Sequence, residues 1–161
     1  MLTVRDALET DFEKIMEIYR SAQQLMIESG NPTQWGHTYP SEELIHDDIK
    51  NHICKVVCDE DDIHGVFALC EGEDPTYGYI EGAWLDDEPY IAIHRVASDG
   101  QVRGILACAV SYTSGMSRNI KIDTHADNLR MQHLIEKRGF TKCGTIYVED
   151  GSPRIAYQRC K

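Results

Sequence analysis

The sequence predicts an α/β protein of the mixed α+β kind, with a mixed six- to seven-stranded sheet that carries helices on both faces. Two observations lead to this class. β-rich runs and helical repeats of apolar residues follow one another as strand, helix, helix, three strands, helix, strand, helix, two strands. The strand-helix-strand unit predicts a parallel pair, whereas the hairpins predict antiparallel pairs. The 161 residues suffice for one domain spanning 1–161 and are too few for two ordinary domains.

The first fifty residues predict one strand and two helices. Residues 2–5 form a short β-rich run, and Thr10–Glu13 has the spacing of a capping box at a helix start. Residues 30–40 then predict a loop with exposed aromatic side chains, which suggests a lid, and Ser41 marks the start of a second helix. The inward face of the first helix is an apolar series at helical spacing: Phe12, Ile15, Met16, Tyr19, Ala22 and Met26.

The remaining elements alternate strands with helices. Residues 53–58 and 63–70 predict an antiparallel hairpin, and 71–88 predicts an elaborated, partly packed connection. The following runs predict a strand at 89–97, a buried helix at 104–113, a strand at 120–124, a helix capped by Asp127 or Asn128, and a hairpin formed by 141–148 and 154–158.

Charge and cysteine content restrict the partners and the compartment. A formal net charge of −11 argues against nucleic acid and anionic membranes, and it favours a cationic small partner or simply a soluble surface. The six cysteines include no CxxC pair, which predicts reduced thiols. The amino terminus lacks the features of a signal peptide and no apolar run approaches 18 residues, so we expect a cytoplasmic protein. The sequence is compatible with a homodimer.

The most informative stretch is Gln101-Val102-Arg103-Gly104, between the strand that ends at Ala97 and the helix that starts near Gly104. A basic, glycine-containing loop at a helix start presents unpaired amides and a positive helix end to an anion. The loop lacks both the G-x-x-x-x-G-K-[ST] and the G-x-G-x-x-G patterns. It therefore predicts either a phosphate-bearing cofactor of another kind or an ordinary turn between a strand and a helix.

This loop resembles the cofactor loop of the GNAT superfamily of acyl-coenzyme A N-acyltransferases, which reads Gln or Arg, two residues, Gly, one residue, Gly or Ala. Five of the six positions agree, and Leu106 replaces the small residue. A second match is the segment 128–140, which looks like the family's Asn-headed helix ending in Glu-Lys-x-Gly-Phe. Ile135 stands where the family often has a tyrosine that is the proposed general acid.

The resemblance implies a GNAT-like fold and acetyl-coenzyme A as cosubstrate. Backbone amides would bind the pyrophosphate, with added charge from Arg103, and the free strand edge at Val96 and Ala97 would pair with the pantetheine arm. The N–H near Val96 would also polarise the thioester carbonyl, and Asn128 would either bind the arm or only cap its helix. The pyrophosphate-binding amides would be those of Gln101, Val102, Arg103, Gly104, Ile105 and Leu106.

Acetyl transfer needs a neutral amine, and an alkyl ammonium has a pKa of about 10.4, so a base or a water chain must remove a proton. His94 is the candidate base, because in an extended strand it would share a side with Val96. Arg95, on the opposite side, would fix a neighbouring carboxylate. Trp35, Tyr39 and Trp84 are candidates for the wall of an acceptor pocket, with core or lid packing as the alternative.

These features predict an N-acetyltransferase that acts on a primary amine in a ternary complex. An acyl-coenzyme A sensor of the same fold is a second hypothesis, motivated by Ile135 and Leu106. A third is a small metal-dependent hydrolase, since Asp123, His125 and Asp127 alternate like metal ligands. Because Asp127 is placed to cap a helix and no further ligand lies nearby, we expect no metal.

Overall fold

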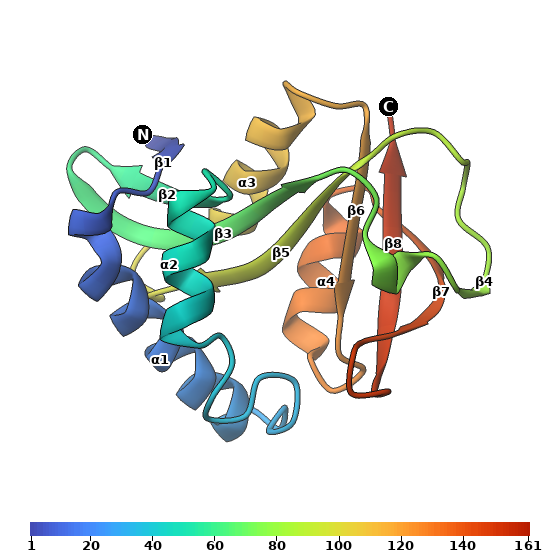
Figure 1. Cartoon of the computed structure of the whole chain (residues 1–161), viewed down its shortest axis with the longest axis horizontal. Helices are drawn as coiled ribbons and strands as arrows, with labels where there is room; N and C mark the ends of the chain where they lie inside the picture. The colour runs from blue at the N-terminus through green and yellow to red at the C-terminus, as the bar shows by residue number, and fades with distance from the viewer.

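The computed structural model describes all 161 residues and contains one mixed sheet of eight strands, in the order β1-β2-β3-β5-β6-β8-β7-β4 (Figure 1). Only β5 and β6 pair in parallel, and the other neighbours are antiparallel. The strands are β1 (Leu2–Asp6), β2 (Cys54–Asp59), β3 (Asp62–Glu71), β4 (Glu81–Gly82), β5 (Ile91–Ser98), β6 (Asn119–Thr124), β7 (Thr141–Tyr147) and β8 (Pro153–Cys160).

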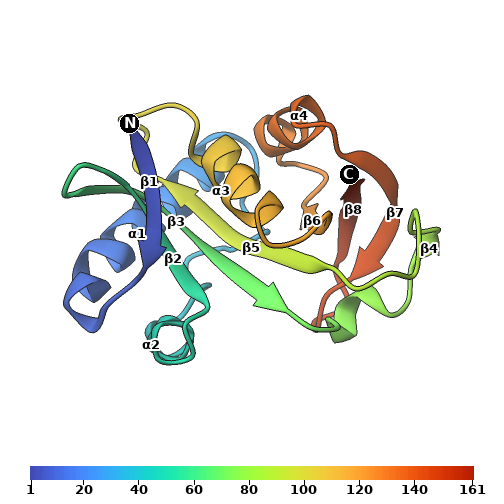
Figure 2. The same cartoon turned by 90° about the horizontal axis from the view of Figure 1, so that it is seen from above.

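Four α-helices cover the two faces of the sheet, as the sequence predicted: α1 (Phe12–Glu28), α2 (Glu42–Lys50), α3 (Ile105–Ser114) and α4 (Leu129–Lys137). Figure 2 shows α3 and α4 together on one face, with α2 on the opposite face. The side chains of β2 alternate accordingly, since Val56 packs in the cluster under α1 and α2 and Val57 packs in the cluster under α3 and α4. None of the helices has both the length and the apolar character needed to cross a bilayer.

Two details at the periphery differ from the sequence-based predictions. The eighth strand is β4, a two-residue strand within the 71–88 connection, where Gly82 pairs with Gly144 of β7. The connection also contains the 3₁₀ helix Pro75–Tyr77. At the start of α1, the predicted capping box does not use Thr10. Instead, a 3₁₀ helix (Glu9–Asp11) precedes α1, and the Asp11 carboxylate accepts a hydrogen bond from the Leu8 N–H at 2.8 Å.

The sheet splits at its centre. β5 and β6 pair only at Ile91 with Ile120 and at Ala92 with Lys121. Beyond Ala92 the two strands separate, and Figure 1 shows β5 turning away while β6 continues beside β8. The part of β5 that carries the predicted site residues therefore has an edge without a neighbouring strand, as the resemblance implied.

A bulge in β5 corrects the predicted side-chain directions. His94 lies opposite Ala68 of β3 and Ala97 lies opposite Val66, so two residues of β5 face the single residue Phe67. Arg95, the inserted residue, has a φ of 52°. As a result His94 and Arg95 both contact residues on the α1 and α2 side, whereas Val96 packs under α3. The expectation that His94 shares a side with Val96, opposite Arg95, was wrong.

The start of α3 is fixed by two glycines. Gly104 caps the helix with a φ of 91°, a conformation that favours glycine, and its Cβ position is open to solvent. Gly65 on β3 allows close packing of the first helical turn, because a Cβ there would lie 2.6 Å from Ile105 Cγ2. The loop between β5 and α3 is therefore held against the sheet on one side and is open on the other.

Candidate active site

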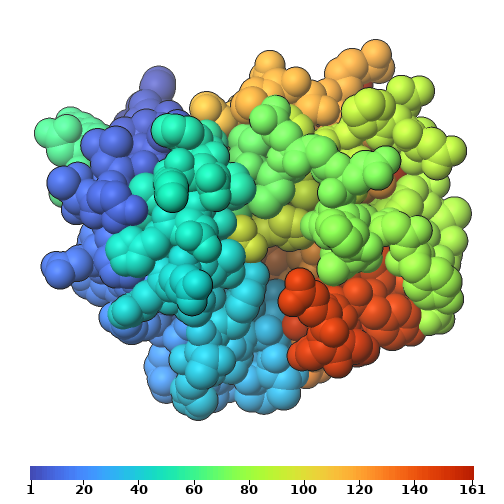
Figure 3. Space-filling model, viewed as in Figure 1, coloured from blue at the N-terminus to red at the C-terminus, as the bar shows by residue number.

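The split in the sheet opens into a cavity of about 790 Å³. Its walls come from β5, β6, the loop at 33–39, the segment 70–76 and the turn between β7 and β8. In Figure 3 the hollow lies between the light-blue loop, the green segment and the red turn. The cavity therefore collects residues that are far apart in the sequence, including His94, Val96, Asp123 and Asn128.

Free amides are present at the predicted phosphate loop, at the far end of β5. The N–H groups of Val102, Arg103 and Gly104 donate to no protein acceptor, and the first-turn amides of Ile105 and Leu106 have no acceptor within the helix. Arg103 is exposed and forms no ion pair. The loop can thus accept an anion along this run of amides.

One of the amides predicted to bind the anion already donates to an acceptor within the protein. The Gln101 N–H donates to the Asp99 carboxylate at 2.9 Å, and the other oxygen of Asp99 lies 2.7 Å from His64 Nδ1. The free run therefore begins at Val102, one residue later than predicted. Leu106 is buried in the core cluster under α3, so its larger side chain points into the core and leaves its N–H available.

The middle of the split contains polar groups that suit an amide-bearing arm. Asn128 caps α4 by accepting the Met131 N–H at 3.1 Å, while its amide nitrogen faces Gln34 Oε1 at 3.2 Å. Asn128 also lines the cavity, so capping and ligand contact are compatible. Thr124 lines the same cavity, and its hydroxyl is fully buried and has no hydrogen-bond partner. A buried hydroxyl without a partner is costly, and a polar ligand group would satisfy it.

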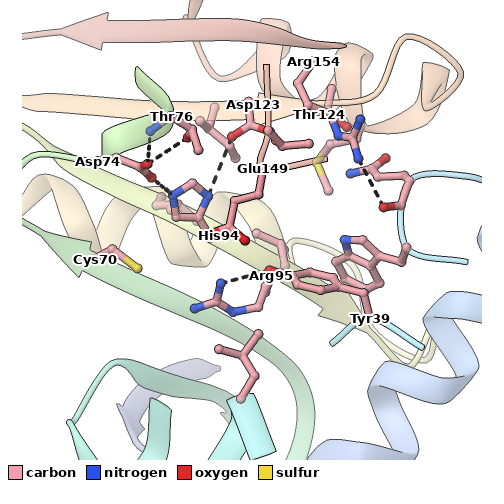
Figure 4. Close-up of a pocket in the computed structure, with 18 of the residues that line it drawn as sticks. Tyr39, Cys70, Asp74, Thr76, His94, Arg95, Asp123, Thr124, Glu149 and Arg154 are labelled. Atoms are coloured by element: carbon pink, nitrogen blue, oxygen red, sulfur yellow. Dashed lines mark hydrogen bonds and ion pairs between the residues drawn. The ribbon is translucent and has the colours of Figure 1, made fainter. Parts of the chain in front are cut away.

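His94 lies between two carboxylates at the split (Figure 4). Its Nε2 is 2.8 Å from Asp74 Oδ2, and its Nδ1 is 3.7 Å from Asp123 Oδ2. Asp123 Oδ2 accepts the Tyr77 hydroxyl at 2.7 Å. Burial raises the pKa of the Tyr77 phenol well above its usual range, so Tyr77 is a donor to Asp123. The site is a connected network of an imidazole, two carboxylates and a phenol.

Arg95 fixes a buried carboxylate, as predicted, although it does so from the same face as His94. Its guanidinium contacts Asp48 Oδ2 of α2 at 2.9 Å, and both side chains are largely buried. It also donates to the Tyr39 hydroxyl at 3.1 Å, and its backbone carbonyl accepts the Tyr19 hydroxyl at 2.8 Å. These contacts tie the bulge to α1, α2 and the 30–40 loop.

The three aromatic residues predicted for the acceptor pocket lie in two places. Tyr39 is 40% exposed at the cavity, and Trp35 lines the cavity while packing on Tyr19 with ring centroids 5.7 Å apart. Trp84 does not line the cavity, because its ring covers the ammonium of Lys121 at 3.9 Å. Trp84 is therefore a packing residue of the 71–88 connection, and it was wrongly assigned to this pocket.

The predicted metal-like alternation is dispersed. Asp123 faces Tyr77 and His94. His125 Nδ1 accepts the Asp127 N–H at 3.0 Å, and its Nε2 lies 3.2 Å from the Thr33 hydroxyl. His125 Nδ1 also lies 3.6 Å from Asp127 Oδ2, but Asp123 faces elsewhere, so the three side chains do not converge. No cluster of three or more histidine, cysteine or acidic residues fits a metal ion.

Several functional candidates were missed in the sequence. Asp74 and Tyr77 lie in a connection whose shape has no sequence pattern, and they reach His94 only because the 3₁₀ helix Pro75–Tyr77 folds back over β5. Arg154 also lines the cavity, with only 7% of its surface exposed, and it donates to the Gln34 carbonyl at 3.3 Å. Its position at a predicted strand start gave no indication of that contact.

Solved structures share this architecture. A GNAT-family acetyltransferase from Streptococcus agalactiae 2603 is 28% identical with a TM-score of 0.90, and the match covers 99% of this chain and 95% of that chain. A GNAT-family acetyltransferase from Listeria monocytogenes 4b F2365 is 18% identical with a TM-score of 0.72 over 99% and 95% of the two chains. A ribosomal-protein-alanine N-acetyltransferase from Brucella melitensis is 18% identical with a TM-score of 0.67 over 99% of both. No protein-family model and no curated protein matches the sequence.

The split sheet, the free amides before α3 and the structural matches define an acyltransferase fold. The likeness at a TM-score of 0.90 extends over 99% of this chain, so it includes the loop and the Asn128-headed helix. The chain belongs to the GNAT superfamily of acetyltransferases.

Proposed function

We propose that this protein is an N-acetyltransferase that moves an acetyl group from acetyl-coenzyme A to a primary amine in a ternary complex. The observation that carries the proposal is the connection of two features by one strand. β5 bears His94 and Val96 at the cavity and leads directly into the loop whose amides are free from Val102 to Leu106. This connection supports a ligand path along β5, with the phosphate groups proposed to bind at the loop and the amine proposed to react at the cavity.

The residues present fit acetyl-coenzyme A. The free amides and Arg103 suit the pyrophosphate, and the open Cβ position of Gly104 allows the ligand to approach the backbone. The unpaired edge of β5 at Val96 and Ala97, the Thr124 hydroxyl and Asn128 suit the amides of the pantetheine arm. When bound, acetyl-coenzyme A supplies the thioester whose C–S bond breaks as the new C–N bond forms.

His94 is the proposed base. Its imidazole lies in the cavity wall, where it removes one proton from the acceptor ammonium before the nitrogen attacks the thioester carbonyl carbon. A second proton leaves the nitrogen with the thiolate, which departs as the free thiol. Because Val96 faces the other side of the sheet, its backbone N–H and not its side chain is proposed to polarise the carbonyl oxygen.

The acceptor is proposed to be a cationic primary amine, as in a polyamine, an amino sugar, an amino-acid derivative or a protein amino group. Four carboxylates at the cavity form no ion pair within the protein: Glu71, Glu73, Glu149 and Asp150. All four are exposed, so their field attracts an ammonium to the mouth without desolvating it. Tyr39 and Trp35 provide an apolar wall next to them.

The proposal is tested by two measurements on the purified chain. Calorimetry with acetyl-coenzyme A should show binding, and the ligand should raise the midpoint of thermal unfolding. Free thiol should then appear only when a suitable amine is added from a panel of amines. Failure to bind acetyl-coenzyme A would reject the proposed cofactor and the proposed activity together.

A sensor of the same fold is the second candidate, favoured by one observation. Ile135, where the family often has a tyrosine, is fully buried in the core under α4, so no hydroxyl is supplied from that position. A sensor binds acetyl-coenzyme A and releases no thiol with any amine, nor by hydrolysis. Amine-dependent thiol release excludes the sensor.

A further inference from the structure

Asp74 is held rigidly beside His94. Its Oδ1 accepts the N–H of Thr76 at 2.9 Å and the hydroxyl of Thr76 at 2.7 Å. Its own N–H donates to the Tyr90 hydroxyl oxygen at 2.7 Å. The remaining oxygen, Oδ2, therefore has one fixed direction, toward His94 Nε2 at 2.8 Å. A carboxylate whose backbone is anchored and whose first oxygen accepts two hydrogen bonds can orient another group through its second oxygen.

The geometry determines which nitrogen of His94 carries the proton. Burial alone raises the pKa of Asp74, but the hydrogen bonds from His94 and Thr76 outweigh it and hold that pKa at about 2. Asp74 is thus ionised at neutral pH and can only accept hydrogen bonds. The proton in the contact between His94 and Asp74 must then be on Nε2, which leaves Nδ1 as the basic nitrogen of neutral His94.

The surroundings of Nδ1 suit a proton acceptor. Asp123 Oδ2 is 3.7 Å away, which is too far for a hydrogen bond, and it already accepts the Tyr77 hydroxyl. The other charged groups near His94 are Arg95, which is paired with buried Asp48, and the exposed Glu149 of the cavity. Once Nδ1 takes a proton, the imidazolium lies between the carboxylates of Asp74 and Asp123.

We propose that Asp74 is a positioning residue for acetyl transfer, which holds His94 in the Nε2–H tautomer so that Nδ1 receives the proton of the acceptor amine. The inference rests on the proposed function. In the transfer, the acceptor ammonium first loses one proton to Nδ1. The neutral amine then forms the C–N bond while the C–S bond breaks, and the second nitrogen-bound proton goes to the leaving thiolate. His94 then releases its proton to solvent.

The tautomer is measured directly by nitrogen-15 NMR of the histidine-labelled chain. His94→Gln identifies the His94 signals among those of the seven histidines. We expect a protonated Nε2 and an unprotonated Nδ1 in the neutral form. A neutral His94 protonated on Nδ1 would overturn the inference without using any activity measurement, so this failure differs from a failure of the proposed function.

Asp74→Asn is the decisive variant. The bonds from Thr76 keep the amide oxygen at the Oδ1 position, so the NH₂ group replaces Oδ2 and donates to Nε2. The proton of neutral His94 moves to Nδ1, and kcat should fall by about 100-fold, while the KM for acetyl-coenzyme A stays within about twofold. The rising limb of the plot of kcat against pH should also change in this variant.

Asp61→Asn is the matched control, since it removes one carboxylate from the exposed turn between β2 and β3. It should keep the wild-type tautomer and the wild-type kcat. An Asp74→Asn variant that has the wild-type kcat and pH profile would overturn the positioning role. If this variant does not fold, the NMR result on the wild-type chain still decides the tautomer.

Discussion

The conformation of single residues sets the geometry of the phosphate loop. Gly104 has a φ of 91° and an open Cβ position, and it lies within the run of free amides. Gly104→Ala should destabilise the fold by about 1–2 kcal/mol because of the left-handed backbone. It should also abolish acetyl-coenzyme A binding, because the added methyl group occupies the ligand's path. Thermal unfolding and calorimetry measure the two effects separately.

Gly100→Ala provides the matched control for this prediction. Gly100 lies in the same loop, has a φ of 77° and also has an open Cβ position, but its N–H already donates to Ser98 Oγ at 3.0 Å. A similar loss of stability with retained affinity is expected. Equal loss of affinity in both variants would show that backbone strain, and not access to the free amides, explains the effect at Gly104.

The buried pair of Asp48 and Arg95 is a second feature at the residue scale. Burial raises the pKa of Asp48, and the attraction of Arg95 only partly opposes this shift. Asp48→Asn leaves the guanidinium of Arg95 buried without a counter-charge, so the free energy of unfolding should fall by about 3 kcal/mol. Urea unfolding of the wild type and the variant measures this loss of stability. Asp47→Asn, on the exposed face of the same helix, should change stability by no more than about 0.5 kcal/mol.

At the scale of elements, close packing links β3 to the cofactor loop. A methyl group at Gly65 would lie within 3 Å of both Cγ2 and Cδ1 of Ile105, the first residue of α3. Gly65→Ala should therefore cost about 2 kcal/mol through overpacking and should weaken acetyl-coenzyme A binding by displacing the helix start.

A double-mutant cycle with Ile105→Ala tests this packing. Ile105→Ala alone should cost about 2–4 kcal/mol, because a buried side chain is lost. In that background Gly65→Ala should cost almost nothing, since the clashing atoms are gone. If the two costs add, the effect of Gly65→Ala arises from the strand itself and not from its contact with α3.

The sequence predicted the elements well because their signals are local. Apolar periodicity identified α1, turn residues identified the hairpins, and the Gln101–Leu106 pattern located the loop before α3. The eighth strand escaped because β4 has two residues and depends on the close approach of Gly82 to Gly144, which is a tertiary contact. The direction of His94 relative to Val96 was wrong for a related reason, since the bulge at Arg95 is fixed by Tyr19 and Asp48 from distant helices.

The candidate site could be predicted only in part, for the same physical reason. His94 could be named as a candidate because it lies in a predicted strand near a recognisable loop. Asp74 and Tyr77 were not, because an irregular connection brings them to His94. Trp84 looked like a pocket residue, but its ring packs on a lysine of β6 and does not line the cavity. Local patterns locate elements, whereas the partners of a side chain depend on how distant segments pack.

At the scale of the whole molecule, paired carboxylates determine the acid stability. The hydrogen bond from Lys55 lowers the pKa of Asp6, and the hydrogen bonds from Arg5 lower that of Asp11. Asp74 shifts the same way, although burial acts against it, and Asp48 shifts the opposite way. A lowered carboxyl pKa means that the unfolded chain binds protons first as the pH falls, so protonation favours unfolding.

Asp6, Asp11 and Asp74 should therefore make their full contribution to the free energy of unfolding above about pH 5. This contribution should decline toward pH 2, as the pH passes the unfolded and then the folded pKa values.

Asp11→Asn removes one of these groups. The Asp11→Asn variant should be less stable than the wild type at pH 7. The difference should shrink as the pH falls to about 3, because protonation of Asp11 then removes from the wild type the charged contact with Arg5 that the variant lacks. Urea unfolding of both chains across this range measures the difference, and a gap that stays constant with pH would show that the Arg5 contact stabilises the fold independently of the charge on Asp11.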